Sequence, residues 1–150
     1  MLVVVDDKNQ IIFDRFLQLY ENEWAHLTEA TTNEEGLYTE YQETIKDFKT
    51  YLLFDQLNPF GFAVVNIEGV HEILDFFILP SYRRKLFGLK VIGELFESFP
   101  GDWQIHQPLE EEKVVKFWKR AVQTHTKGNF EEVSLYHKRW KKALKLTFSV

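Results

Sequence analysis

The stretch that most constrains the fold runs from residue 71 to residue 99, where a buried strand, a basic turn and an amphipathic helix follow one another. A nearly unbroken apolar run, as in a strand buried on both faces, is formed by Ile73, Leu74, Phe76, Phe77, Ile78 and Leu79. Pro80 ends this strand, because proline has no N–H to give to a neighbouring strand. After the SYRRK turn, apolar residues recur every three or four positions and predict a helix over 86–98.

The basic turn and the helix that follows it suggest a binding site for an anion. The first N–H groups of a helix have no partner within the helix, and the helix N-terminus carries partial positive charge. Three cations in the turn add to that charge, so the turn suits a phosphate group. The alternative interpretation is a solvated basic turn that only begins a helix.

The rest of the chain reads as alternating strands and helices, which predicts a mixed α/β (α+β) fold. Asp7 with Gln10, and Thr32 with Glu35, have the spacing of capping boxes and predict helix starts. We expect helices near 8–27, up to residue 48 after Thr32, and near 110–124. We expect strands over 2–5, 51–56, 60–68, 71–79, 103–107, 130–136 and 142–149.

Composition indicates a single domain over residues 1–150 with ample core material, since 45% of the residues are hydrophobic. The absence of cysteine excludes a disulfide scaffold, a thiolate nucleophile and a cysteine zinc site. No two of the five histidines have ligand spacing on one helix, so we expect no metal, with His106 the one histidine of interest. The opening MLVVVDDKNQ is not a signal peptide and no run is long enough for a membrane span, which leads us to expect a cytoplasmic protein that does not bind membranes.

Charge is distributed unevenly along the chain. Residues 1–50 hold 11 acidic against 4 basic residues, whereas residues 113–150 hold 10 basic against 2 acidic residues. Such charge is either solvated surface, or it places acidic groups near a cationic substrate and basic groups near an anionic one. The HKRWKKALK segment could suggest a nucleic acid, but the pI near 5.6 and the lack of a reader motif argue against that partner.

The segment YRRKLFGLKVIGELF resembles the acyl-CoA-binding segment of the GCN5-related N-acetyltransferase (GNAT) superfamily. The family pattern is Arg/Gln-x-x-Gly-x-Gly/Ala; Arg83 matches its first position and Gly88 its last, while Leu86 stands where the first glycine is usual. The resemblance continues through GDWQIHQP, VVKFWKRAV and TKGNFEEV to KLTFSV. It implies a mainly antiparallel mixed sheet with flanking helices, in which the strands 71–79 and 103–107 splay apart.

The resemblance also implies how acetyl-CoA would be bound as co-substrate. The turn would hold the pyrophosphate through backbone N–H groups and basic side chains, and the strand before it would bind the pantetheine amides through its backbone. Trp118 would form the floor of the thioester pocket. The turn residues implied are Arg83, Arg84, Lys85, Leu86, Phe87, Gly88 and Leu89, and the strand residues are Phe77, Ile78 and Leu79.

An amine is protonated at neutral pH and must lose a proton before it attacks a thioester, which a carboxylate can accept. Glu72 resembles the base of the histone-acetylating branch, and Asp75 occupies a position that is often acidic in relatives; each could instead be structural. The phenol that many relatives use as general acid is replaced by Trp118, and the Asn common at the start of that helix by Glu111. Catalysis by proximity would tolerate both departures.

These inferences predict an acyltransferase that moves acetyl from acetyl-CoA to a primary amine of a cationic small molecule or a protein. The acidic residues over 34–47 favour a cationic acceptor. The alternative is a non-catalytic GNAT-fold module that binds CoA or a protein partner. Exposed edge strands near the C-terminus could pair two copies into a homodimer.

Overall fold

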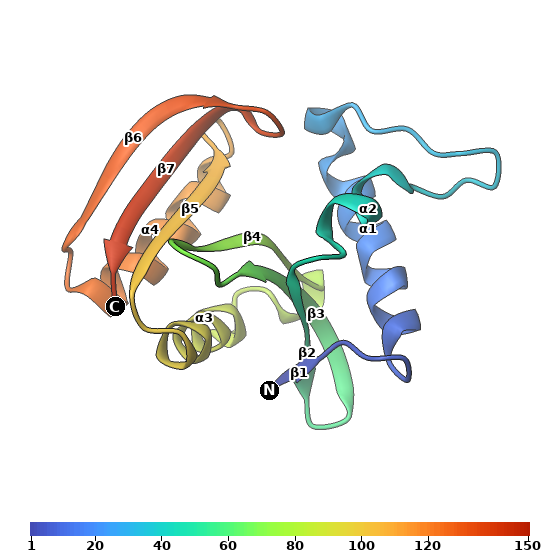
Figure 1. Cartoon of the computed structure of the whole chain (residues 1–150), viewed down its shortest axis with the longest axis horizontal. Helices are drawn as coiled ribbons and strands as arrows, with labels where there is room; N and C mark the ends of the chain where they lie inside the picture. The colour runs from blue at the N-terminus through green and yellow to red at the C-terminus, as the bar shows by residue number, and fades with distance from the viewer. The chain divides into compact units, whose positions relative to one another are not determined.

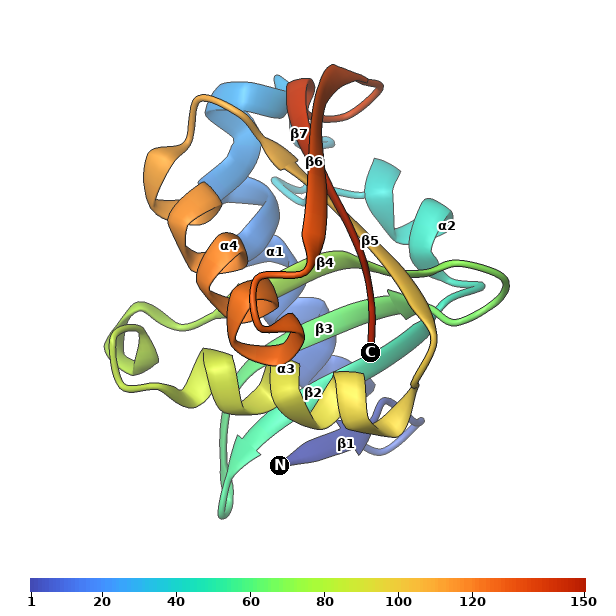
Figure 2. The same ribbon diagram turned by 90° about the vertical axis from the view of Figure 1, so that its left-hand side faces the viewer.

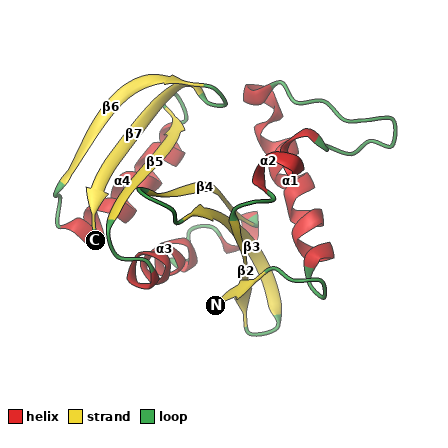
Figure 3. Cartoon of the chain, viewed as in Figure 1, coloured by secondary structure: helices red, strands yellow, loops and turns green.

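The computed structural model describes residues 1–150 and shows a mixed α/β fold with flanking helices (Figure 3). The strands form a seven-stranded mixed sheet in the order β1-β2-β3-β4-β5-β7-β6. A short 3₁₀ turn, Pro80–Tyr82, follows β4. The helices are α1 (Gln10–Thr28), α2 (Glu40–Ile45), α3 (Phe87–Ser98) and α4 (Glu112–Thr126). The strands are β1 (Leu2–Val4), β2 (Lys49–Asp55), β3 (Asn58–Asn66), β4 (His71–Ile78), β5 (Asp102–Pro108), β6 (Phe130–His137) and β7 (Lys141–Ser149).

The chain divides into two compact units that share strand β4. The first unit comprises residues 1–65 and 75–83, and the second comprises residues 66–74 and 84–150. The first half of β4 therefore belongs to the second unit, and its second half belongs to the first unit. The expectation of one domain over residues 1–150 stays a prediction.

The first unit is built on an aromatic core between α1 and the strands. Phe13 of α1 meets Phe62 of β3 edge to face, with ring centroids 5.1 Å apart, and Tyr20 lies 5.3 Å from the same ring. Phe16 lies 5.9 Å from Phe77 of β4. Three aromatic residues spaced along one side of α1 thus fix the helix on β3 and β4, because edge-to-face ring pairs add to the free energy of apolar burial.

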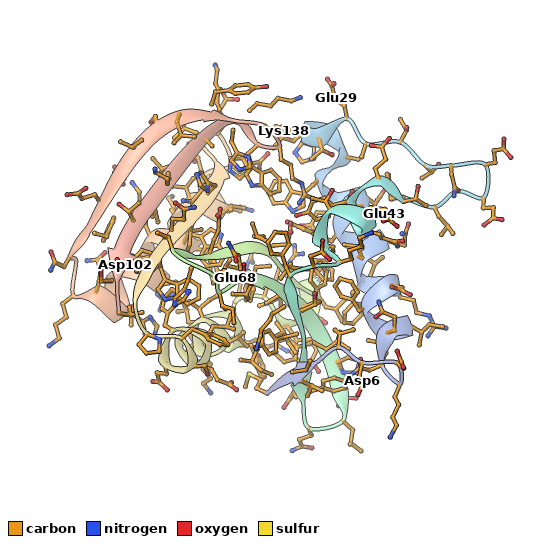
Figure 4. The ribbon with its side chains drawn as sticks, in the orientation of Figure 1. Asp6, Glu29, Glu43, Glu68, Asp102 and Lys138 are labelled. Carbon is orange, nitrogen blue, oxygen red and sulfur yellow. The ribbon has the colours of Figure 1, made fainter.

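The second unit is a β5–β7–β6 antiparallel sheet with α4 packed against all three strands (Figures 1 and 2). Asp102 begins β5, and Lys138 lies in the turn between β6 and β7, so the two residues mark opposite ends of this sheet in Figure 4. The first half of β4 joins β5 in parallel, with His71 opposite Trp103 and Glu72 opposite Gln104. The edge strand β6 is largely exposed; its pairing with a second copy stays a prediction.

The two faces of this sheet differ in polarity because side chains alternate along a strand. Trp103 and Ile105 of β5 are buried, and Trp103 lies 5.0 Å from Phe96 of α3, so these positions face the helices. The intervening residues Gln104 and His106 project from the other face, which neither α3 nor α4 covers. This second face carries polar groups in place of core residues.

Both predicted capping boxes are wrong, although the helix after the first one is confirmed. Helix α1 begins after Asn9, and Asp6 holds the preceding turn by accepting the Lys8 and Asn9 N–H groups through its Oδ1 at 2.9 and 3.1 Å. No helix begins near Thr32, and α2 covers only six residues. The backbone of that segment is held instead by Asn33, whose side-chain oxygen accepts two N–H groups within a turn.

No helix of the structure combines the length and the apolar character that crossing a membrane requires.

Candidate functional site

The turn between β4 and α3 adopts a backbone conformation that favours glycine. Arg84 has φ 69° and Leu86 has φ 65°. Positive φ values are uncommon for residues with a Cβ atom, whereas glycine adopts them without steric cost. Leu86 is the position at which the GNAT pattern has its first glycine, so the leucine takes up the glycine conformation. Leucine in place of glycine at this position therefore does not change the course of the backbone in the turn.

Helix α3 begins directly after this turn without a capping side chain. Leu86 is the N-cap residue and its side chain makes no capping hydrogen bond. The helix is fixed by a buried face that includes Gly88, Val91 and Ile92. Arg84 and Lys85 are exposed beside the helix start. N–H groups at a helix start, beside two exposed cations, can bind an anion such as a diphosphate.

Arg83 is engaged within the first unit. Its Nε donates a hydrogen bond to the Ile78 carbonyl at 2.8 Å, and its Nη2 pairs with Glu23 of α1 at 2.8 Å. The guanidinium also lies 5.8 Å from the centroid of the Phe77 ring. A cation with these partners ties the end of β4 to α1, and its predicted contact with phosphate stays a prediction.

The backbone at the end of β4 already has partners of its own. The Leu79 N–H donates to the Phe60 carbonyl of β3 at 2.8 Å, and the Ile78 carbonyl accepts from Arg83. Gly61 of β3 lies so close to the Phe77 carbonyl that no side chain would fit there. The predicted pantetheine contacts of Phe77, Ile78 and Leu79 stay predictions. The backbone N–H of Leu79 is used in its hydrogen bond to β3.

Glu72 lies in a polar cluster on the face of the second unit's sheet that is opposite α4. Its Oε1 lies 2.6 Å from Nδ1 of His106, and its Oε2 accepts a hydrogen bond from Gln104 Nε2 at 2.9 Å. The side chains of Glu72 and His106 are 13% and 14% exposed. The sequence marked His106 only as a histidine of interest for metal binding. Parallel pairing of β4 with β5 and the two-residue alternation could have indicated its contact with Glu72.

Asp75 is buried at 2% exposure in the first unit. Tyr20 of α1 donates to its Oδ1 at 2.6 Å, and Tyr41 of α2 donates to its Oδ2. A carboxylate that accepts two phenol hydrogen bonds binds both helices to the strand. Asp75 and Glu72 thus have separate partners in separate units. The choice between them as proton acceptor, which the sequence left open, stays a prediction.

Trp118 belongs to the core of the second unit. It is 7% exposed on α4 and contacts the Phe117 ring at a centroid distance of 5.1 Å. The role of Trp118 beside a thioester stays a prediction. Helix α4 begins after Glu111, whose side chain makes no capping hydrogen bond. The structure contains no group of three His, Asp or Glu side chains placed to hold a metal ion.

No protein-family model and no curated protein matches the sequence, whereas solved structures match along the whole chain. One is a Bacteroides thetaiotaomicron protein assigned as an acetyltransferase of the GNAT family (15% identity, TM-score 0.68, covering 100% of this chain and 87% of that one). Another comprises mutant forms of the Vibrio cholerae spermidine/spermine N-acetyltransferase (18% identity, TM-score 0.65, covering 99% and 92%). A third is the ribosomal-protein-alanine N-acetyltransferase of Brucella melitensis (12% identity, TM-score 0.63, covering 100% and 99%). The expected GNAT fold is therefore confirmed.

Proposed function

We propose that the protein is an acyl-CoA-dependent N-acyltransferase that moves acetyl from acetyl-CoA to a primary amine. The observation that carries this proposal is the turn into α3, where Arg84 and Leu86 have glycine-like φ values and no side chain caps the helix. The backbone of this turn thus has the course that lets a glycine turn approach a diphosphate, even though its sequence lacks the usual glycine. The fold supports the same function, because solved structures with this fold are acetyltransferases.

In this proposal the start of α3 holds the pyrophosphate of acetyl-CoA. The N–H groups of residues 87–89 supply hydrogen bonds, and Arg84 and Lys85 screen the charge. The backbone of Phe77–Leu79 binds the pantetheine arm as a strand would, and Trp118 lies beside the thioester. The reactants are then oriented by binding, which contributes to catalysis without any covalent step on the protein.

We propose a cationic acceptor, either a small molecule or a protein. The exposed carboxylates of Glu40 and Glu43 on α2 support this, together with Glu34 and Glu35 before the helix (Glu43 is labelled in Figure 4). Glu43 pairs with Lys46 at 2.9 Å, and the hydrogen bond and positive charge of Lys46 lower the pKa of its carboxyl. Two of the matched structures are a spermidine/spermine N-acetyltransferase and a ribosomal-protein-alanine N-acetyltransferase, which justifies testing both acceptor classes.

The cofactor site is tested by calorimetry with acetyl-CoA and paired charge reversals. Replacing Arg84 and Lys85 together by Glu should weaken binding by about tenfold or more, since each exposed cation contributes up to about 1 kcal/mol to an ion pair. The control replaces Lys113 and Lys116 by Glu on the exposed side of α4, which changes the net charge equally. Equal affinities of the two double variants would contradict the proposed site.

Acetyl transfer is tested by release of the CoA thiol in the presence of polyamines and of peptides with free amino groups. Thiol release that depends on the amine supports the enzyme.

A second candidate function is a GNAT-fold module that binds acetyl-CoA or a protein partner without catalysis. It is favoured by two observations, the burial of Trp118 where relatives have a phenol and the engagement of Arg83 by Glu23. Binding of acetyl-CoA without thiol release over the whole amine panel would support this module, and transfer to any amine would exclude it.

A further inference from the structure

Glu72 and His106 form a carboxylate–imidazole pair that the proposed function has not used. The pair lies on the face of the second unit that α3 and α4 leave uncovered, and Gln104 holds the other carboxylate oxygen. Both side chains are mostly buried, with 13% and 14% of their surfaces exposed. A short contact between two mostly buried groups of this kind has a defined geometry, because water competes little for either partner.

The contact determines which nitrogen of His106 carries a proton. A carboxylate oxygen can only accept a hydrogen bond, so the Nδ1 atom at 2.6 Å is the donor. The neutral ring then has its lone pair on Nε2. An imidazole held in this tautomer by a carboxylate is ready to accept a proton at Nε2, and the carboxylate stabilises the imidazolium that forms.

Other titratable neighbours of His106 come from β6 and β7. The ring of His137 lies 4.8 Å from that of His106, and its Nδ1 accepts the backbone N–H groups of Arg139 and Trp140 at 3.1 and 3.2 Å. The Nδ1 atom of His137 that accepts these hydrogen bonds carries no proton itself. Lys145 is the cross-strand partner of His106 on β7 and is a cation. Glu72 is the opposing anion.

Resting on the proposed transferase function, we propose that His106 is the proton acceptor for the attacking amine and that Glu72 is its positioning residue. One proton of the acceptor ammonium passes to His106 Nε2. The amine nitrogen then forms a C–N bond to the thioester carbonyl carbon, and the C–S bond breaks. The second nitrogen proton passes to the CoA thiolate. The imidazolium returns its proton to water, so one proton is released in each cycle.

The test is the pH dependence of acetyl transfer to a primary amine, from about pH 5.5 to about pH 10. His106→Gln should lower kcat by about 100-fold at neutral pH and leave the KM for acetyl-CoA unchanged. The deficit should shrink toward about pH 10, where a primary amine loses its proton unaided. Glu72→Gln should lower kcat and leave the KM for acetyl-CoA unchanged, because His106 then loses the carboxylate that fixes its tautomer.

The matched control is His26→Gln, which makes the same replacement at an exposed position of α1. This variant should have the same pH profile of acetyl transfer as the parent protein. An ascending limb in His106→Gln equal to that of the parent would overturn the role of His106 while leaving the transferase function intact. A parent protein that binds acetyl-CoA but acetylates no amine would overturn both.

One readout needs no activity. Nitrogen NMR of the histidine side chains should show His106 with its proton on Nδ1 in the neutral form. A proton on Nε2 instead would overturn the proposal directly.

Discussion

Leu86 offers a direct test of the backbone conformation on which the proposed cofactor site depends. Its φ of 65° is a conformation that residues with a Cβ atom rarely adopt, and its side chain is 53% exposed. Two variants separate backbone strain from the loss of side-chain contacts. Leu86→Ala removes most of the side chain but keeps the Cβ atom, whereas Leu86→Gly removes both.

The expected difference follows from two opposing terms. A Cβ atom in the left-handed region costs about 1–2 kcal/mol. A glycine at this position avoids that cost, but it also makes the unfolded chain more flexible, which lowers stability by about 0.4–1 kcal/mol. Leu86→Gly should therefore be more stable than Leu86→Ala by about 0.5–1 kcal/mol, or about 1–4 °C in Tm for a chain of this size.

Thermal and urea unfolding of the two variants measure this difference. Lys90, exposed within α3, provides the control because its backbone is helical. There the order should reverse, with Lys90→Ala more stable than Lys90→Gly by about 1 kcal/mol. If alanine is also the more stable residue at position 86, the turn does not have the glycine-like backbone, and the argument for a close approach to diphosphate fails with it.

Three further predictions concern packing, hydrogen bonding and pH. Gly61→Ala should lower the free energy of unfolding, measured by urea titration, by about 3 kcal/mol, because the added Cβ would collide with a carbonyl oxygen of β4. The control is Gly69→Ala, where the added Cβ faces open space at φ +64°; it should cost only about 1 kcal/mol. Tyr41→Phe removes one of the two phenol donors to the buried Asp75 carboxylate and should cost about 1.5–3 kcal/mol in denaturant unfolding, so an unchanged midpoint would contradict that contact. Burial raises the pKa of the Tyr51 phenol, so the contribution of the neutral phenol to stability is complete below the unfolded-state pKa of about 10 and is lost as pH rises through the folded-state pKa. Tyr51→Phe should therefore lose less stability than the parent over that pH range. Equal losses in the two proteins would refute the raised pKa of Tyr51.

Most of the elements could be predicted from the sequence because their signals are local. The apolar run before Pro80 and the helical spacing after the basic turn gave β4 and α3 to within one or two residues. The capping boxes failed for a physical reason. Asp6 and Asn33 accept several backbone N–H groups in turns, and such turns compete with helix starts that have similar sequences.

The site was only partly predictable. Glu72 could be named from its place on β4, yet its partner His106 lies more than thirty residues away and is brought to it by pairing of β4 with β5. Arg83 illustrates the opposite case. Its place in the motif suggested a phosphate ligand, whereas the fold gives it a carboxylate of α1 and a carbonyl of β4 as partners.

Periodicity and proline position determined the order of strands and helices, since each depends on neighbours within a few residues. The tertiary structure alone decided the φ of Leu86, the pairing of Glu72 with His106 and the enclosure of Asp75 by two phenols. The physical reason is that proton position and strain depend on groups distant in sequence, which only the folded sheet and its helices bring within hydrogen-bond distance.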